Sequence, residues 1–280
     1  MVFAFWLNTG FAILEIAGGL YTQSVAVLSD ALHDFGDSLS IGLSYYFHKK
    51  SAKKRDEAFS YGYKRFSLLG AFINSVVLIL GSAFVIQESV SRLFTPVQPD
   101  PRGMLLLAVI GVVVNGIAMV RLRSGVTIQE SVLSLHFLED ILGWIAVLVG
   151  SVVMMFVNAP FIDPLLSLLI AAFILFNVYR NLRRAFQIIL QGIPENVDVG
   201  EIERSVRSIK GVVGIHDLHA WSMDGHYNIM TLHMVVNPET GQKELDAIKE
   251  VVRSKVLSQN IQHLTIETEF EDEECALKEC

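Results

Sequence analysis

The chain has 280 residues, of which 52% are hydrophobic and only 18% are charged, and its mean hydropathy is +0.46. Average soluble domains carry about 25% charged residues, so this composition excludes an ordinary soluble globular enzyme. The formal net charge is −7, and acidic residues gather near the end, between Glu267 and Glu274. That acidic stretch argues against nucleic acid as a partner.

The composition changes sharply along the chain. Long apolar runs follow one another up to about Arg184, whereas the sequence from Gln191 onward is typical of a soluble domain. This shift predicts a membrane domain over residues 1–185 and a soluble domain over 191–271, followed by an acidic tail with two cysteines over 272–280.

Six runs in the first part are long enough to cross a bilayer, which requires roughly 20 mostly apolar residues. They are Val2–Leu20, Val25–Phe47, Phe66–Gln87, Met104–Leu122, Val132–Val157 and Phe161–Leu182. Basic residues concentrate in the loops after the second and fourth runs and at the end of the sixth, whereas the opposite side has only Arg92 and Arg102. Basic loops stay on the cytoplasmic side, so we expect both termini in the cytoplasm.

The second part alternates between helical and strand periods. Asp198–Ile209 is predicted as an amphipathic helix with Asp198 as its N-cap. The segments that follow are predicted as a strand, a strand, a helix and a strand, over Val212–Trp221, His226–Val236, Thr240–Leu257 and Gln262–Phe270. The fold class is therefore a multi-pass α-helical membrane protein with six transmembrane helices and a small C-terminal α+β domain of order αββαβ.

Ionisable residues interrupt two of the apolar runs, although each costs roughly 2.5–3.5 kcal/mol at the centre of a bilayer. The second run carries Asp30, His33, Asp34 and Asp37, and the fifth carries His136, Glu139 and Asp140. Their spacing places each group on one face of its helix. Gly143 continues the face of the fifth run and would let a neighbouring backbone approach closely.

Both runs contain the spacing His-x-x-x-Asp, as His33/Asp37 and His136/Asp140. Residues four apart are neighbours on a helix, so two facing pairs would supply the two imidazoles and two carboxylates that zinc accepts in tetrahedral sites. Such a site is electrically neutral when it holds a divalent ion, which a low-dielectric interior requires. Asp30 or Asp34 could also pair with His33; Asp37 is favoured because it repeats the spacing of the second pair.

Asp30 and Glu139 are then interpreted as groups that support the ligands, relay protons or line the entrance. Metal and protons compete for the same ligands, and histidine titrates near neutral pH, which favours metal–proton exchange by alternating access. Two other classes compete with this hypothesis. A membrane-bound metal sensor would bind zinc without flux, and a metallo-hydrolase would need an open coordination position that a four-ligand set lacks. We therefore expect a transporter and no enzymatic activity.

Several segments together resemble the cation diffusion facilitator family, in particular its zinc-transporting branch. The resemblance covers nearly the whole chain. It rests on Leu7-Asn8 with Glu15, on Ser29–Asp37, Phe59–Arg65, Leu135–Asp140 and Ile162–Ser167, and on Gly211–Trp221 in the soluble part.

The resemblance implies a homodimer that exports zinc from the cytoplasm across the cell membrane in exchange for protons. It also implies that the soluble domain is metallochaperone-like and coordinates regulatory zinc through His216, His233 and Glu269. Glu267 stands where other members have a ligand histidine, and His263 lies close to a further ligand position. Cys275 and Cys280 are similar to the cysteine tail of animal zinc transporters and are possible tail ligands.

The sequence also departs from the family pattern. Some bacterial relatives bind a second metal between the second and third spans, but here Asp56 is accompanied by Phe59 and Tyr63 where histidines would be needed. The histidine-rich loop of many animal members is absent from Arg121–Glu130, which favours a bacterial plasma membrane. Trp144 stands where a small residue is usual, so we expect altered packing at that position.

Overall fold

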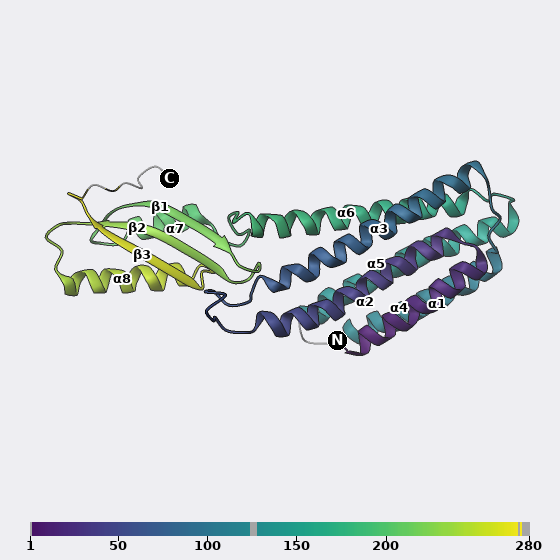
Figure 1. Cartoon of the computed structure of the whole chain (residues 1–280), viewed down its shortest axis with the longest axis horizontal. Coiled ribbons are helices and arrows are strands. Elements are labelled where there is room, and N and C mark those ends of the chain that lie inside the picture. Colours follow the sequence, from purple (N-terminus) through teal and green to yellow (C-terminus); the bar gives the residue numbers. More distant parts are fainter. Residues whose placement is uncertain (1, 124–127, 274, 276–280) are drawn as a thin grey trace. The chain divides into compact units, whose positions relative to one another are not determined.

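The computed structural model describes residues 2–123, 128–273 and 275 (Figure 1). The chain divides into two compact units. One comprises Met1–Lys49 and Leu69–Leu182, and the other comprises Lys50–Leu68 and Arg183–Cys280. The loop between the second and third helices therefore belongs to the same unit as the soluble domain.

Each of the six predicted runs is a helix. They are α1 (Val2–Thr22), α2 (Val25–Ser51), α3 (Phe66–Phe94), α4 (Pro101–Arg123), α5 (Ile128–Phe156) and α6 (Ile162–Ile189). Within the described ranges, three helices are individually long and apolar enough to cross a membrane, namely α3, the part of α4 over Pro101–Val120, and α6. The ionisable side chains of α2 lower its hydropathy, and these same residues are the candidate site residues of this helix.

Trp144 on α5 packs inside the membrane unit. Its side chain is fully buried, and its ring meets that of Phe11 on α1 edge to face, with centroids 5.8 Å apart. On α4, Gly111 lies against the indole so closely that a Cβ at this position would collide with it. Because Gly111 has no side chain, α4 leaves the space that the indole of Trp144 fills.

Asp163, at the start of α6, caps the first turn of α2. Its Oδ2 accepts a hydrogen bond from the backbone N–H of Val25 at 2.8 Å, and its Oδ1 accepts from Ala26 at 3.2 Å and from the Ser24 hydroxyl at 2.5 Å. The first N–H groups of a helix have no partners within the helix, and a carboxylate there interacts favourably with the helix dipole. The start of α2 is thus fixed about two turns before His33.

The turn between α1 and α2 has further anchors. Gln23 has a positive φ of 53°, and its carbonyl accepts a hydrogen bond from the Arg92 guanidinium at the end of α3. The carbonyl of Thr22 accepts from the backbone N–H of Asp100, just before α4, at 2.9 Å. Residues of α3 and α6, together with the residue just before α4, therefore all make hydrogen bonds to this one turn.

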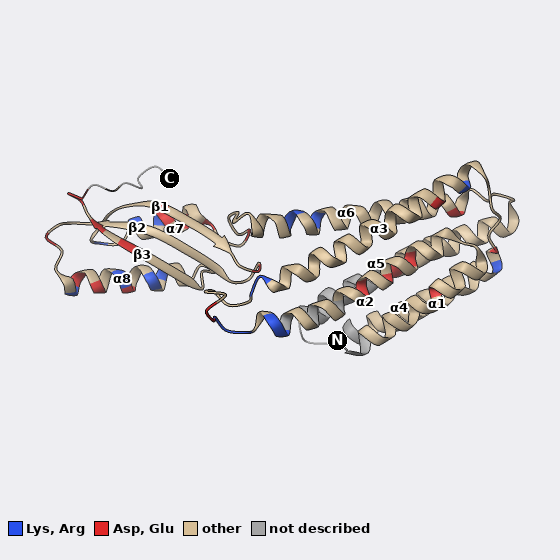
Figure 2. Ribbon diagram, viewed as in Figure 1, with Lys and Arg blue, Asp and Glu red and all other residues tan. Residues whose placement is uncertain are grey.

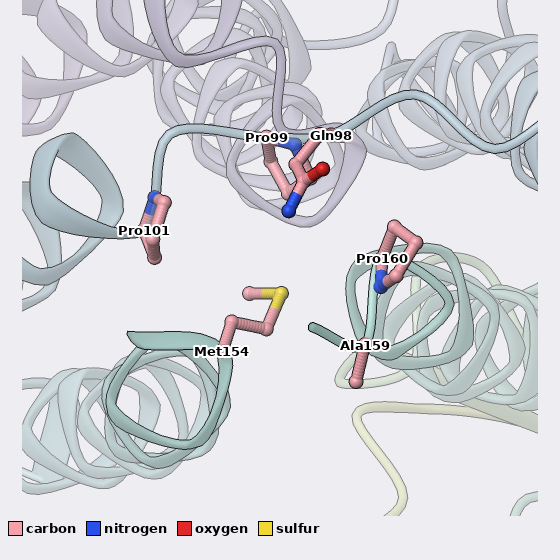
Figure 3. A pocket seen from close by; sticks show the side chains of 6 residues that line it. All are labelled: Gln98, Pro99, Pro101, Met154, Ala159 and Pro160. Atoms are coloured by element: carbon pink, nitrogen blue, oxygen red, sulfur yellow. The ribbon is translucent and has the colours of Figure 1, made fainter. Parts of the chain in front are cut away.

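A small cavity of about 10 Å³ lies between the α3–α4 and α5–α6 connections (Figure 3). Its lining consists of Gln98, Pro99, Pro101, Met154, Ala159 and Pro160. A space of this size holds at most a single water molecule, and its lining includes no ionisable side chain. The cavity is therefore no candidate for a metal site.

The soluble domain has the predicted order αββαβ. Its elements are α7 (Val199–Arg207), β1 (Val212–Ser222), β2 (Asn228–Val236), α8 (Gln242–Leu257) and β3 (His263–Phe270). The strands form one sheet of order β1-β2-β3, in which β1 and β2 are antiparallel and β2 and β3 are parallel. Asp198 caps α7 as predicted, since its Oδ1 accepts from the N–H of Glu201 at 2.8 Å.

The two faces of this sheet differ. Residues Met230, Leu232, Met234 and Val236 of β2 are fully buried in one cluster with side chains of α7 and α8, such as Ile202 and Val252. Because side chains alternate along a strand, His233 points to the other face. The candidate metal ligands of this domain thus lie on the face away from the helix-covered core.

Replacing Asp163 with alanine is expected to lower the free energy of unfolding by about 1–3 kcal/mol, because buried donors at the start of α2 lose their acceptor. Denaturation of the detergent-solubilised chain would measure the change. Ser167→Ala is the matched control, since its hydroxyl donates to the carbonyl of Asp163 within α6. Equal midpoints for wild type and Asp163→Ala would contradict the capping role.

Candidate functional site

The membrane unit brings side chains of α2 and α5 together around His33. The Nε2 atom of His33 lies 3.6 Å from Oδ2 of Asp37 and 3.8 Å from Oδ1 of Asp140. Ligand atoms around a tetrahedral zinc are roughly 3.3–3.5 Å apart, so small movements would bring these three atoms to a common ion. The side chains of His136 and Glu139 lie outside the described residues, although both positions belong to α5.

The neighbouring carboxylates are buried. Asp30 and Asp34 are 4% and 1% exposed. Oδ1 of Asp30 lies 3.6 Å from the position that a Cβ of Gly143 would occupy, so the side chain of Asp30 reaches α5 at its glycine. Asp30 is therefore placed against α5, next to the candidate ligands.

Glu15 on α1 is a member of this cluster that the sequence analysis did not single out as a site residue. It is fully buried, and the charged groups that act on it include Asp34, Asp30 and Asp140. Nearby, the amide of Asn8 donates to the backbone carbonyl of Asp34 at 3.0 Å. The available signal was an ionisable residue inside an apolar run. Figure 2 shows acidic residues at mid-length on α1 and α2.

These carboxylates impose a physical requirement on the cluster. Negative charges packed this closely inside a low-dielectric interior repel one another, and burying them without compensation is costly. The arrangement is therefore stable only when a cation or protons share it. A set of ligands with this property can exchange a metal ion for protons.

A second cluster lies on the sheet of the soluble domain. The strand register places His216, His233 and Glu267 side by side on β1, β2 and β3. Glu269 bridges the two imidazoles, with Oε1 2.5 Å from Nδ1 of His233 and Oε2 3.2 Å from Nε2 of His216. The Sγ atom of Cys275 lies 3.7 Å from the same Nδ1.

Four residues of this cluster fit a zinc ion. His216, His233, Glu269 and Cys275 each offer one ligand atom, and these atoms lie within 4.8 Å of one another. Nitrogen, oxygen and sulfur are the donors that zinc takes in tetrahedral sites. Burial acts to raise the pKa of Glu269, but hydrogen bonds from Cys275 and His233 and the nearby His216 hold it below its usual value, which keeps this carboxylate ionised at neutral pH.

The other predicted ligands of this domain lie differently. Glu267 is largely exposed, and its Oε2 lies 3.7 Å from the opposite nitrogen of His233, Nε2. His263 begins β3 opposite Ile229, and its ring meets that of Tyr61 edge to face at 5.6 Å. The structure therefore does not bring His263 to the cluster. Cys280 lies outside the described residues.

Asp217 is a residue of this site that the sequence analysis did not identify. Its φ of 47° falls where the pairing of β1 shifts between His216 and His219. This backbone conformation points the carboxylate toward His233 on β2 and His219 on β1. Its Oδ2 lies 3.4 Å from Nε2 of His233, and its Oδ1 lies 2.8 Å from Nε2 of His219. A carboxylate on Nε2 orients the ring and leaves Nδ1 available as a ligand.

In the loop between α2 and α3, the carboxylate of Asp56 accepts hydrogen bonds from within the loop. Its Oδ2 accepts hydrogen bonds from Nζ of Lys53 at 2.9 Å and from the hydroxyl of Tyr63 at 2.7 Å. Its Oδ1 accepts from the backbone N–H groups of Ala58 and Phe59, both at 3.0 Å. The contact with Lys53 is the main reason that the pKa of Asp56 lies well below its usual value. In the structure this carboxylate is therefore occupied by protein donors.

Comparison with known proteins identifies the family. Residues 1–190 match the cation efflux transmembrane domain, and residues 194–271 match the cytoplasmic domain of cation efflux proteins. The chain belongs to the cation efflux family. The resemblance to zinc-transporting cation diffusion facilitators is thereby confirmed.

Curated relatives align over nearly the whole chain. A cadmium, cobalt and zinc/H(+)-K(+) antiporter of Bacillus subtilis (strain 168) is 32% identical over 97% of this chain and 88% of its own length. The metal cation efflux system protein CzcD of Cupriavidus metallidurans is 31% identical, over 94% of this chain and 84% of its own. The zinc transporter ZitB of Escherichia coli (strain K12) is 27% identical, over 97% and 87%.

Asp217→Asn is expected to weaken zinc binding by the soluble domain by about 10–100-fold, because the neutral amide no longer orients the ring of His233. A competition titration with a fluorescent chelator would measure the affinity. The full-length chain would carry His33→Ala and Asp140→Ala, so that the membrane site does not contribute. Asp224→Asn, in the turn between β1 and β2, is the control; an equal loss of affinity in both variants would refute the specific role of Asp217.

Proposed function

We propose that this protein exports zinc from the cytoplasm across the cell membrane in exchange for protons, through a site formed by His33, Asp37, His136 and Asp140. The observation that carries the proposal is the meeting of α2 and α5 at His33, which lies within 3.8 Å of carboxylate oxygens from both helices. Two imidazoles and two carboxylates would make a neutral site for a divalent ion.

Exchange, as opposed to permanent binding, is supported by the surrounding carboxylates. Glu15, Asp30 and Asp34 are buried beside the proposed ligands, so the cluster holds more carboxyl groups than one divalent ion can neutralise. Protons that occupy these groups when the metal leaves would restore the balance. Asp30 and Glu139 are the groups we propose for relaying protons.

The relatives support the direction and range of transport. They bear the names of a cadmium, cobalt and zinc/H(+)-K(+) antiporter, a metal cation efflux protein and a zinc transporter. We propose zinc as the main substrate because two imidazoles favour it over the harder divalent ions. Homodimer formation in the bilayer, with both termini in the cytoplasm, completes the proposal, and it agrees with the basic residues at the end of α2 and in α6 (Figure 2).

The soluble domain supports a second role. His216, His233 and Glu269 gather on one sheet face, with the carboxylate in contact with both imidazoles. We propose that these residues bind zinc from the cytoplasm and that this ion regulates transport.

In proteoliposomes with an imposed pH gradient, His33→Ala and Asp140→Ala are each expected to reduce zinc flux to the level of protein-free vesicles, because each removes a ligand of the proposed site. Encapsulated zinc-sensitive dye would report the flux. His226→Ala removes an exposed histidine in the β1–β2 turn and should leave the flux unchanged. Wild-type flux in either ligand variant would disprove the site assignment, and flux that ignores the pH gradient would disprove proton exchange.

A further inference from the structure

The chain reverses direction immediately after β3. The backbone N–H of Glu271 donates to the carbonyl of Val236 at 3.1 Å, which extends the pairing with β2 by one residue. A tight turn follows, in which the N–H of Glu273 donates to the carbonyl of Phe270 at 3.0 Å and the Glu273 carboxylate accepts from the N–H of Phe270 at 2.9 Å. After this turn, Cys275 lies back over the sheet, next to His233.

Cys275 is the residue that the turn delivers to the metal-binding face. Its side chain is partly buried, its Sγ lies 3.7 Å from Nδ1 of His233, and it hydrogen-bonds with Glu269. The ligand atoms of all four residues in the cluster face one another within 4.8 Å. The cysteine therefore occupies the position of a fourth ligand opposite the two imidazoles and the carboxylate.

Charge favours this assignment. His216 and His233 bind metal as neutral imidazoles, and Glu269 contributes one negative charge, so three ligands alone leave a divalent ion with a net charge of about +1. A metal ion deprotonates the thiol that coordinates it, and the thiolate supplies the missing negative charge. With Cys275 the site is neutral and fully coordinated; without it a coordination position stays open to water.

We propose that Cys275 is the fourth ligand of the regulatory metal and that metal binding thereby fixes Cys275 onto the open face of the sheet. This inference rests on the proposed binding of metal by His216, His233 and Glu269 and adds the chemical class of the ion. A thiolate selects zinc and cadmium over magnesium, calcium and manganese, which prefer oxygen ligands. The cytoplasmic domain would thus respond to the soft and borderline ions and ignore the abundant hard ones.

Cobalt(II) can test the inference because its absorption reports coordination directly. The full-length chain with His33→Ala and Asp140→Ala, reduced and in detergent, is titrated with cobalt chloride. We expect the visible bands of a tetrahedral ion together with a near-ultraviolet charge-transfer band from thiolate to metal. Cys275→Ser should lose the charge-transfer band and bind cobalt more weakly, whereas Cys280→Ser, the matched control, should retain both.

The possible outcomes distinguish the role of Cys275 from the proposed metal binding by His216, His233 and Glu269. Absence of any tetrahedral cobalt spectrum would overturn metal binding by the soluble domain altogether. Tetrahedral bands without a thiolate band, or a thiolate band lost in Cys280→Ser and kept in Cys275→Ser, would overturn the role of Cys275 alone. On the unmutated chain, zinc should slow alkylation of Cys275 by iodoacetamide, as followed by peptide mass spectrometry; equal rates with and without zinc would also refute the role.

Discussion

The carboxylate of Asp163 fixes where α2 begins, and the placement of the candidate ligand His33 depends on that starting point. Its oxygens accept hydrogen bonds from the N–H groups of Val25 and Ala26 and from the hydroxyl of Ser24, at the start of the helix. A shift of α2 by one residue would move each side chain by about 1.5 Å along the helix axis and rotate it by about 100°. His33 would then no longer face Asp140. A polar contact far from the ligands in sequence therefore sets the register that the ligands need.

The two candidate metal clusters of this protein differ in how their charge is balanced. Around His33, buried carboxylates exceed the two that a divalent ion requires, since Glu15, Asp30 and Asp34 lie beside the candidate ligands. On the sheet, the candidate ligand set of His216, His233, Glu269 and Cys275 would supply two negative charges, one from Glu269 and one from a thiolate at Cys275, which match those of a zinc ion. An excess of carboxylates favours release of the metal to protons, whereas a closed set with a thiolate favours retention. These properties suit a transport site and a regulatory site respectively.

Much of the fold could be predicted because its signals are local. Run length and hydrophobic period predicted all six membrane helices and the order αββαβ, and the spacing of His33 and Asp37 on one helix face predicted their contact. The contacts of Asp163 could not be predicted, because they join residues 139 positions apart and no periodic pattern encodes which helix ends meet. The contacts of Asp217 could not be predicted either, because they depend on the positive φ of this residue. His263 was expected near a further ligand position, but it lies four residues before Glu267 on β3, and four residues along a strand span about 13 Å.

Coupling between metal and protons follows from the same surplus of buried charge. In the proposed exchange, departure of zinc removes two positive charges from a cluster that contains Asp140, Asp30 and Glu15 within the apolar interior. Leaving those carboxylates uncompensated would cost several kcal/mol per ion, so an empty and fully ionised site is not an accessible state. Protons must therefore enter as the metal leaves, and metal must displace protons to return. In this proposal the ligand carboxylates exchange the metal for protons, and the carboxylates beyond the ligand set, including Glu15 on α1, are buried beside them.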